Sequence, residues 1–446
     1  MLKLFLWFRY LRKRKIALLS IAAVALSVSL LTIVSSLFTG FIRAFEQSAT
    51  EAMGDVVLAP AVRFARYPEL IEQLEKTAAV QAATATLSTQ GLLHLGRGNV
   101  RAVRIWGIQP GRRAKVTGFK QTLRNQRNLP GAPSFSIPDA PDKIGGFVGV
   151  AVIAEPDEQT DEYDFSELDR MLGSDAVLTT GAVSGTEEKD NLRVKRRTLK
   201  FAIADVVFTG VYYLDKNYVY LPIEQLQKEL YPDERYPVAD QLQIKIADGI
   251  STDSALAQIR GVWEIFATDK LGWSAPLISY TDIETSQQMQ SRYVAELMKQ
   301  MGVLLLIFGV VSFGVVLLVF CIFYMIARLK QKDVAIMKSC GATSTSVAMV
   351  FVGFGGCVGI AGAALGTVIG YAVTKNINTI EGWIRVVFGL KLWKSSVYMF
   401  SKIPNEVNWN WLVLIVFSAV VAVSVGALIP AIIAARTRPV NILRYE

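Results

Sequence analysis

The side chains that most often carry chemistry are scarce in this sequence. It has one histidine, His94, and three cysteines, Cys321, Cys340 and Cys357. A histidine-rich metal site or a Ser–His–Asp triad is therefore not expected. The cysteines form no C-x-x-C pair, and the phosphate-cradling pattern G-x-x-x-x-G-K-[ST] is missing. We therefore expect a protein that is not an enzyme, binds no metal or cofactor, and takes any energy for work from a partner.

The composition points to a membrane protein. Charged residues make up 19% of the 446-residue chain, against about 25% in soluble proteins. Four segments contain no charged residue or histidine, and each is longer than the ~20 residues that cross a bilayer. They are Ile16–Ile42, Met301–Ala327, Val347–Thr374 and Trp411–Ala435. The first is too long for the apolar part of a signal peptide, so it is expected to be an uncleaved anchor.

Basic residues flank these segments unevenly. Residues 1–15 carry six basic side chains and no acidic one, 328–346 carry four and one, and 436–446 carry three and one. The positive-inside rule places all three on the cytoplasmic side. In residues 43–300, acidic residues outnumber basic ones by 34 to 29. The net charge of +9 therefore reflects membrane topology, and no nucleic-acid partner is expected.

The predicted fold is an α-helical membrane protein with four transmembrane helices and a large α+β extracytoplasmic domain between the first and second. The predicted order is an N-terminal segment with the first span (1–42), the outer domain (43–300), the second span (301–327), a cytoplasmic loop (328–346), the third span (347–374), an outer loop (375–410), the fourth span (411–435) and a cytoplasmic tail (436–446). The outer loop carries five basic and two acidic residues, so it fits the positive-inside rule less well.

Apolar periodicity predicts mixed secondary structure in the outer domain. The expected helices are Tyr67–Ala78 and Thr252–Trp263, the second capped by Ser251 or Thr252. The expected strands are Gly91–Leu95, Val100–Trp106, Asp175–Thr179, Lys200–Tyr213, Tyr218–Leu221 and Gln241–Ile246. Prolines make Leu129–Phe147 a predicted long loop between two lobes. A continuous helix is expected from Thr281 to Arg328, capped by Thr281 or Asp282, which either transmits motion or is a plain connector.

Two charge clusters stand out in this domain. Glu155–Asp164 contains six acidic residues without the spacing of an EF-hand, so it is either a solvated loop or a cation site. Arg193–Arg197, followed by Lys200, is either a solvated strand face or a surface for lipid headgroups or an acidic partner.

The short segment Gln331–Thr345 has an amphipathic helical pattern. Val334, Met337 and Cys340 or Gly341 fall on one apolar face, and Gly341 is expected to end the helix. Such a helix either lies on the membrane or docks into a groove of a soluble partner.

The third span carries glycines spaced three or four apart, which let another helix approach closely. They are Gly353, Gly356, Gly359, Gly362, Gly366 and Gly370. The stripe serves either packing within this chain or a seam between two copies. Pro430 is expected to kink the fourth span. No span contains a charged residue, which argues against an ion-coupled transporter.

These features resemble the type VII ABC transporter permeases, the family of MacB, FtsX and the lipoprotein-releasing LolC/LolE proteins. FRYLRKRK (Phe8–Lys15) is similar to the family's "RYLR" entry before its first span. DVAIMKSCGAT (Asp333–Thr343) resembles the "E-I-G-I-L-R-A-I-G-A" coupling helix, which sits against the ATPase. The resemblance implies an ATPase-coupling role for Asp333, Val334, Ile336, Met337, Lys338, Cys340 and Gly341.

Further pieces resemble the LolC/LolE branch. They are the terminus PAIIAARTRPVNILRYE (Pro430–Glu446), VYMFSKIP (Val397–Pro404), LGSDAVL (Leu172–Leu178) and the strand–Asp–strand stretch Phe208–Gln227. The chain departs from that branch in the Pro-rich loop 129–146. It also departs at Ala182–Thr198, which is polar where the family's carrier-recruiting hairpin is apolar.

The resemblance implies a permease subunit that releases lipoproteins from the bacterial inner membrane. Its expected partners are an ABC ATPase dimer that hydrolyses ATP, a second permease in a homodimer or LolC/LolE-like heterodimer, membrane lipids, acylated or amphiphilic cargo, and a periplasmic carrier. The alternatives are a MacB-like exporter of peptides or amphiphiles, an FtsX-like signalling module that controls a cell-wall hydrolase, and, outside the family, a membrane-anchored enzyme.

Overall fold

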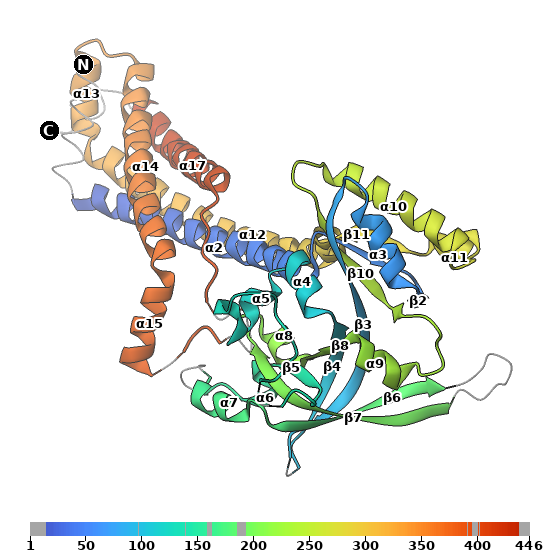
Figure 1. The fold of residues 1–446 in the computed structure, drawn as a ribbon. Coiled ribbons are helices and arrows are strands. Elements are labelled where there is room, and N and C mark those ends of the chain that lie inside the picture. Colours follow the sequence, from blue (N-terminus) through green and yellow to red (C-terminus); the bar gives the residue numbers. More distant parts are fainter. Residues whose placement is uncertain are drawn as a thin grey trace. The chain divides into compact units, whose positions relative to one another are not determined.

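The computed structural model describes residues 15–96, 98–138, 140–157, 163–184, 193–389, 391–394, 400 and 402–436. The chain divides into two compact units (Figure 1). The helical unit comprises Met1–Arg43, Val294–Ile380 and Ile403–Glu446, and the sheet unit comprises Ala44–Tyr293 and Glu381–Lys402.

Four helices are long and apolar enough to cross a membrane. They are α2 (Lys15–Met53), α12 (Ser286–Leu329), α14 (Ser344–Lys375) and α17 (Trp409–Arg436). Each contains one of the uncharged segments, so the prediction of four spans is confirmed. Two shorter helices are α13 (Gln331–Ser339), between α12 and α14, and α15 (Ile377–Phe388), after α14.

The core of the helical unit lies where α14 and α17 pack along each other. Val358, Ala427 and Val319 are buried there, and the Phe323 and Phe354 rings approach to 5.4 Å between centroids. By contrast, only 6% of the most apolar window of α12 is buried. Its remaining apolar surface suits contact with lipid tails.

The sheet unit is built on a nine-stranded mixed sheet with the order β11-β1-β10-β3-β4-β8-β5-β7-β6. The strands are β1 (Val56–Ala59), β3 (Val80–His94), β4 (Val100–Ile108), β5 (Gly145–Gly149), β6 (Asp175–Ser184), β7 (Arg193–Val207), β8 (Tyr218–Pro222), β10 (Gln241–Ile246) and β11 (Asp282–Thr285). A separate pair joins β2 (Phe64–Ala65) to β9 (Val238–Ala239).

The long strand β3 organises this sheet. Its first half pairs with β10, and its second half pairs with both β4 and β6. The β3–β6 pairing closes β3, β4, β8, β5, β7 and β6 into a ring. A Cβ at Gly91 would lie 2.6 Å from the Thr179 carbonyl oxygen on β6. Glycine at that position therefore permits the close approach of the two strands.

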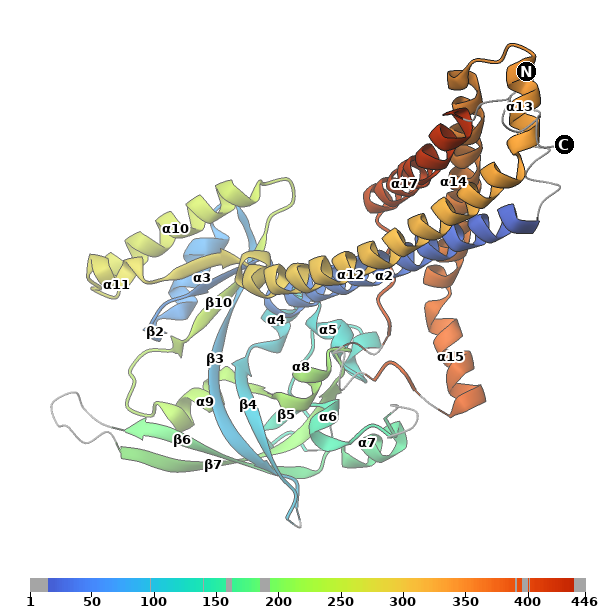
Figure 2. The same ribbon diagram turned by 180° about the vertical axis from the view of Figure 1, so that it is seen from behind.

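Helices cover parts of this sheet (Figures 1 and 2). They are α3 (Tyr67–Glu75), α4 (Pro110–Val116), α5 (Phe119–Thr122), α6 (Val150–Ile153), α7 (Phe165–Met171), α8 (Tyr212–Asn217), α9 (Ile223–Leu230), α10 (Thr252–Asp269) and α11 (Ala275–Ser279). Helix α3 packs on β3, and α10 packs on α3. Ser251 caps α10 by accepting from the Ser254 amide, which agrees with the prediction.

Several predicted boundaries are wrong, and the strand expected over Gly91–Leu95 is the end of a longer strand that begins at Val80. The strand expected over Lys200–Tyr213 ends at Val207, because the chain turns into α8 at Tyr212. The loop expected over Leu129–Phe147 ends in β5, which enters the sheet at Gly145. The cap of α12 is neither Thr281 nor Asp282, since both precede the helix and Asp282 begins β11.

The cap of α12 is Thr285. Its hydroxyl oxygen accepts from the Gln288 amide at 3.0 Å, and the Gln288 side-chain oxygen accepts from the Thr285 amide at 2.9 Å. This reciprocal pair is a capping box. It marks the point where the chain changes from strand to a helix that continues into the membrane span.

The two charge clusters are only partly described. Glu155 pairs with Arg101 at 2.8 Å, and Asp164 caps α7 by accepting from the Ser166 amide at 2.9 Å. Residues 158–162 lie outside the described residues. Among the residues that are described, no group of acidic, cysteine or histidine side chains could hold a metal ion. The basic cluster Arg193–Arg197 lies on β7, paired with β6.

Candidate functional site: the coupling segment and the helix connections

The predicted coupling residues lie on and just after α13, within the helical unit. Val334 and Ala335 are each only 1% exposed. Val334 joins the buried core, and Met337 packs against it. The Lys338 ammonium donates to the Ala435 carbonyl near the end of α17, at 2.6 Å. A short helix gains its stability from such packing, because nine residues are too few for a stable isolated helix.

The opposite face of α13 is open. Ile336 is 55% exposed, and Lys332 and Cys340 are also exposed. Asp333 forms an ion pair with Lys330. Gly341 has a φ of +94°, the left-handed conformation that commonly follows a helix end.

The predicted apolar face of Val334, Met337 and Cys340 or Gly341 is divided between the core and the exposed surface in the structure. Val334 is buried among this chain's own helices and Met337 packs against the same core, whereas Cys340 is exposed. Ile336 is an apolar residue of α13 whose side chain is exposed. Periodicity identifies which residues share a face, but it does not say which of two faces the neighbouring helices cover.

The glycines of α14 meet two different helices. An added Cβ would lie 2.7 Å from the Val24 Cβ at Gly362, 2.5 Å from the Ala25 carbonyl oxygen at Gly366, and 3.0 Å from the Thr32 Cβ at Gly370. These three face α2. Gly359 instead faces α17, with a Cβ 3.3 Å from the Val420 Cα.

The first two members of the predicted stripe are less tightly packed. Gly353 and Gly356 are half-buried, and the atom nearest an added Cβ at Gly356 is 3.8 Å away. Gly355, which the predicted stripe did not include, is closer: its Cβ would lie 2.6 Å from the Ala427 Cβ on α17. Its separation of four residues from Gly359 is the signal that could have identified it.

Within the sheet unit, the end of α2 and the start of α12 are joined by adjacent strands. β1 follows α2, β11 precedes α12, and the two pair antiparallel with Val56 opposite Thr285. The Ser286 hydroxyl donates to the Gly54 carbonyl, and the Ser286 amide donates to the Asp55 carbonyl at 3.1 Å. The strand pairing and these hydrogen bonds therefore join the two helix ends directly.

A buried arginine fixes this junction to the sheet. Arg113, on α4, is 2% exposed; its guanidinium donates to the Ala52 carbonyl at 2.8 Å and to the Gln243 side-chain oxygen at 2.9 Å. It lies 4.7 Å from the centre of the Trp106 ring. Burial lowers the pKa of Arg113 to about 10, so the side chain stays charged at neutral pH. No sequence pattern identified this residue.

A second buried charge, Asp215, shapes the loop before α8. Its carboxylate accepts from the Thr209 amide and hydroxyl, both at 2.8 Å, and from the Gly210 amide at 3.1 Å. Burial raises the pKa of Asp215 to about 7, although these hydrogen bonds lower it. Val211 in the same loop forms a bridge to Phe400, so Asp215 also positions the contact with the segment that follows α15.

Comparison with known proteins agrees with this architecture. Residues 305–439 match the model of the FtsX-like permease C-terminal domain. Over 98% of both chains, the sequence is 25% identical to the lipoprotein-releasing system transmembrane protein LolC of Neisseria meningitidis. It is 24% identical to LolE of Haemophilus influenzae over 96% of this chain and 94% of that protein.

A solved structure of the periplasmic region of MacB from Actinobacillus actinomycetemcomitans is also similar. It is 12% identical, covers 55% of this chain and 95% of its own, and has a TM-score of 0.32.

The helices and these matches define the class of protein. It has four helices long and apolar enough to cross a membrane, a large sheet domain between the first and second of them, and a C-terminal region that matches the FtsX-like permease C-terminal domain. Within that class, it is similar to LolC and LolE along nearly its whole length.

Proposed function

We propose that this chain is a permease subunit of an ATP-driven transporter that releases lipoproteins from the inner membrane. The observation that carries the proposal is the similarity to LolC and LolE, which extends over 98% and 96% of the chain. It therefore includes the sheet unit as well as the FtsX-like helices of residues 305–439.

In this proposal the chain works with an ABC ATPase dimer and a second permease, either another copy or a LolC/LolE-like partner. Both termini and α13 are cytoplasmic, as the basic flanks predict. The exposed face of α13, with Ile336 at its centre, contacts the ATPase. The sequence segments 1–14 and 437–446, which carry many of those basic flanks, lie outside the described residues.

The described contacts support mechanical transmission. α13 packs against the core of the helical unit, and α12 continues as one helix from that unit to the strand junction. There β1, β11 and Arg113 connect both helix ends to the sheet. The apolar, uncharged surface of the spans suits acyl chains, whose burial is worth ~0.8 kcal/mol per CH₂.

The proposal is tested by purifying the tagged chain from its native membranes in mild detergent and identifying everything bound by mass spectrometry. We expect an ABC ATPase, a permease and acylated lipoproteins. Depletion of the chain should then retain lipoproteins in the inner membrane.

Other outcomes would replace this proposal. A bound cell-wall hydrolase without lipoproteins would favour FtsX-like signalling, and sensitivity to peptides or drugs on depletion would favour a MacB-like exporter. The absence of any ATPase would contradict a transporter of this type. Recruitment of a periplasmic carrier through Ala182–Thr198 is tested by crosslinking, since residues 185–192 of that segment lie outside the described residues.

A further inference from the structure

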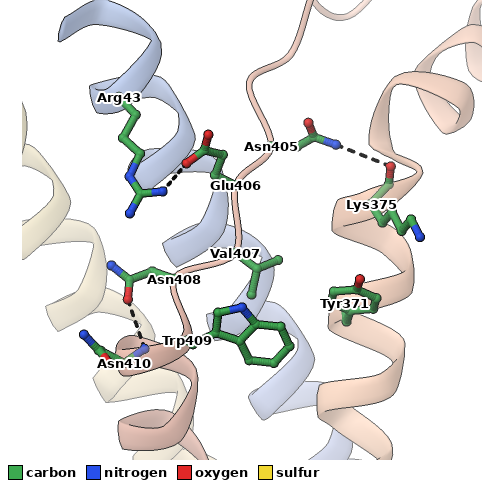
Figure 3. Close-up of a pocket in the computed structure, with 9 residues that line it drawn as sticks. All are labelled: Arg43, Tyr371, Lys375, Asn405, Glu406, Val407, Asn408, Trp409 and Asn410. Atoms are coloured by element: carbon green, nitrogen blue, oxygen red, sulfur yellow. Dashed lines mark hydrogen bonds and ion pairs between the residues drawn. The ribbon is translucent and has the colours of Figure 1, made fainter. Parts of the chain in front are cut away.

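The segment that leads into the fourth span lies between two other spans (Figure 3). This segment, residues 403–408, belongs to the helical unit together with Arg43 of α2 and Lys375 of α14. Arg43 and Lys375 are the first charged residues after the uncharged parts of their helices, so the segment lies where these spans end. It shares no residue with α13 or with the glycine contacts of α14, and is therefore separate from the site described above.

Hydrogen bonds fix this segment to α14 and to the residues that follow it. The Asn405 side chain donates to the Thr374 carbonyl at 2.9 Å and to the Lys375 carbonyl at 3.3 Å. Both carbonyls lie in the last turn of α14, where the regular helical partners run out. The Asn378 side chain donates to the Ile403 carbonyl at 3.0 Å and accepts from the Ile403 amide at 2.9 Å. Separation would remove the partners of several backbone groups, so we expect this attachment to persist.

The attachment of the same segment to α2 is of a different kind. A Cβ added at Gly40 would lie 2.8 Å from the Pro404 carbonyl carbon and 2.9 Å from the Glu406 amide nitrogen, so the two backbones touch. Beside this contact, Arg43 and Glu406 form an ion pair whose side chains remain 58% and 52% exposed. An ion pair this exposed adds little net stability and weakens as salt is added. The segment can therefore separate from α2 at a smaller cost than from α14.

Space beside the ion pair gives the segment room to move. A pocket of about 780 Å³ is lined by Arg43 and Glu406 as well as by Lys375 and Tyr371 of α14. Figure 3 shows the ion pair on the α2 side and the Asn405 bond on the α14 side. In a close-packed interior a segment cannot shift without displacing its neighbours. Here the ion pair borders open space, so it can open without repacking the helices.

We propose that residues 403–408 act as a releasable clasp between α2 and α14. The hydrogen bonds to α14 stay in place, and the contacts with Gly40 and Arg43 open when α2 moves away. The clasp acts on the helix that continues to the junction of β1 with β11 in the sheet unit. Its use in a transport cycle rests on the proposed function, but the clasp itself requires neither the ATPase nor the cargo.

The test cross-links the ion pair in the full chain, purified with its native partners. In Arg43→Lys, a carbodiimide condenses the introduced amine with the Glu406 carboxylate; an amide bond forms, and the reagent takes up the water and becomes a urea. Lys299 and Glu296 provide the internal reference, because they pair at 3.2 Å on one helix and cannot move apart. Arg43→Lys combined with Glu406→Gln is the matched control and should form no cross-link between these positions.

We expect the cross-link between positions 43 and 406 to form. Because the clasp opens as its ion pair is screened, the yield relative to the internal reference should fall about two- to fivefold between about 0.05 and 1 M salt. The cross-linked complex should lose ATP turnover in proportion to the cross-linked fraction. The control variant, treated in the same way, should retain it.

Each arm has an outcome that counts against the clasp. Absence of the cross-link in a folded chain would overturn the contact itself. A relative yield that does not change with salt, or full ATP turnover at complete cross-linking, would overturn its release. If no ATPase copurifies, the proposed function fails, while the cross-link and its salt dependence still decide for or against the clasp.

Discussion

Replacing Ile336 with aspartate should detach the ATPase without unfolding the chain. Ile336 lies on the exposed face of α13, whereas Val334 on the opposite face is buried in the helical unit. Ile336→Asp therefore changes the surface offered to a partner. Met337→Asp instead places a carboxylate against the chain's own core, since Met337 packs there.

The size of the effect follows from exposure. Full burial of an isoleucine side chain contributes about 1.5–3 kcal/mol. Ile336 is 55% exposed. Covering this exposed part on ATPase binding is therefore worth about half of the full burial energy, roughly 1–2 kcal/mol. Burying an aspartate at the proposed ATPase contact without a hydrogen-bond partner costs about 1–3 kcal/mol more. The two together weaken ATPase binding by at least about thirtyfold.

The assay titrates purified ATPase onto the chain in lipid nanodiscs, with Kd, ATP turnover and thermal unfolding measured on the same samples. Ile336→Leu is the control and should retain binding. Ile336→Asp should lose affinity at an unchanged unfolding temperature, while Met337→Asp should lower the unfolding temperature. Unchanged Kd and turnover in Ile336→Asp would refute the reasoning. So would a stably folded Met337→Asp that fails to bind, because the face inferred from periodicity would then be the docking face.

Three further changes test the other contacts. Gly366→Ala should destabilise the helical unit by about 1–3 kcal/mol, because its Cβ would lie 2.5 Å from the Ala25 carbonyl oxygen. Gly356→Ala is the control and should not destabilise it, because there is room for its Cβ. Thermal unfolding of the two variants in detergent compares them. Arg113→Met should lower the unfolding free energy by about 2–4 kcal/mol, because the hydrogen-bond partners of Arg113 are left unsatisfied. Hydrogen exchange at the end of α2 should increase in this variant. Unchanged exchange would contradict the inference that Arg113 fixes the end of α2 to the sheet. Asp215 has a pKa of about 7 when folded, above its unfolded value, so its contribution to stability should fall as pH rises from about 4 to 7. The difference in unfolding free energy between the natural chain and Asp215→Asn should vary over that interval, and a constant difference would contradict the raised pKa.

The spans and several domain elements could be predicted because their signals are local. An uncharged run longer than the bilayer core requires a helix, since each backbone group must find its hydrogen bond within the segment. Helix α3 has its buried residues Tyr67, Leu70, Ile71 and Leu74 at helical spacing, and Ser251 caps α10 as its position suggests. Each of these structures depends on residues within a few positions of one another.

The missed elements depend on partners far away in the sequence. β5 begins with two glycines and lies in the sheet because β8 and β7 flank it. β11 is only four residues long, and its partner β1 lies more than 200 residues earlier. Arg113 is one of many arginines in the sequence, and only the fold brings it to the end of α2. Periodicity within a segment contains no information about such pairings.

The packing of α13 was likewise not predictable from periodicity alone. The spacing of Val334 and Met337 identified an amphipathic helix, and the resemblance to a coupling helix suggested that its apolar face meets the ATPase. In the structure that face is already occupied by the core of the helical unit. A helix that transmits force needs two attachments, one to the body it moves and one to the body that moves it. The buried face and the Lys338 bond to Ala435 supply the first, and in the proposed function the exposed face around Ile336 supplies the second.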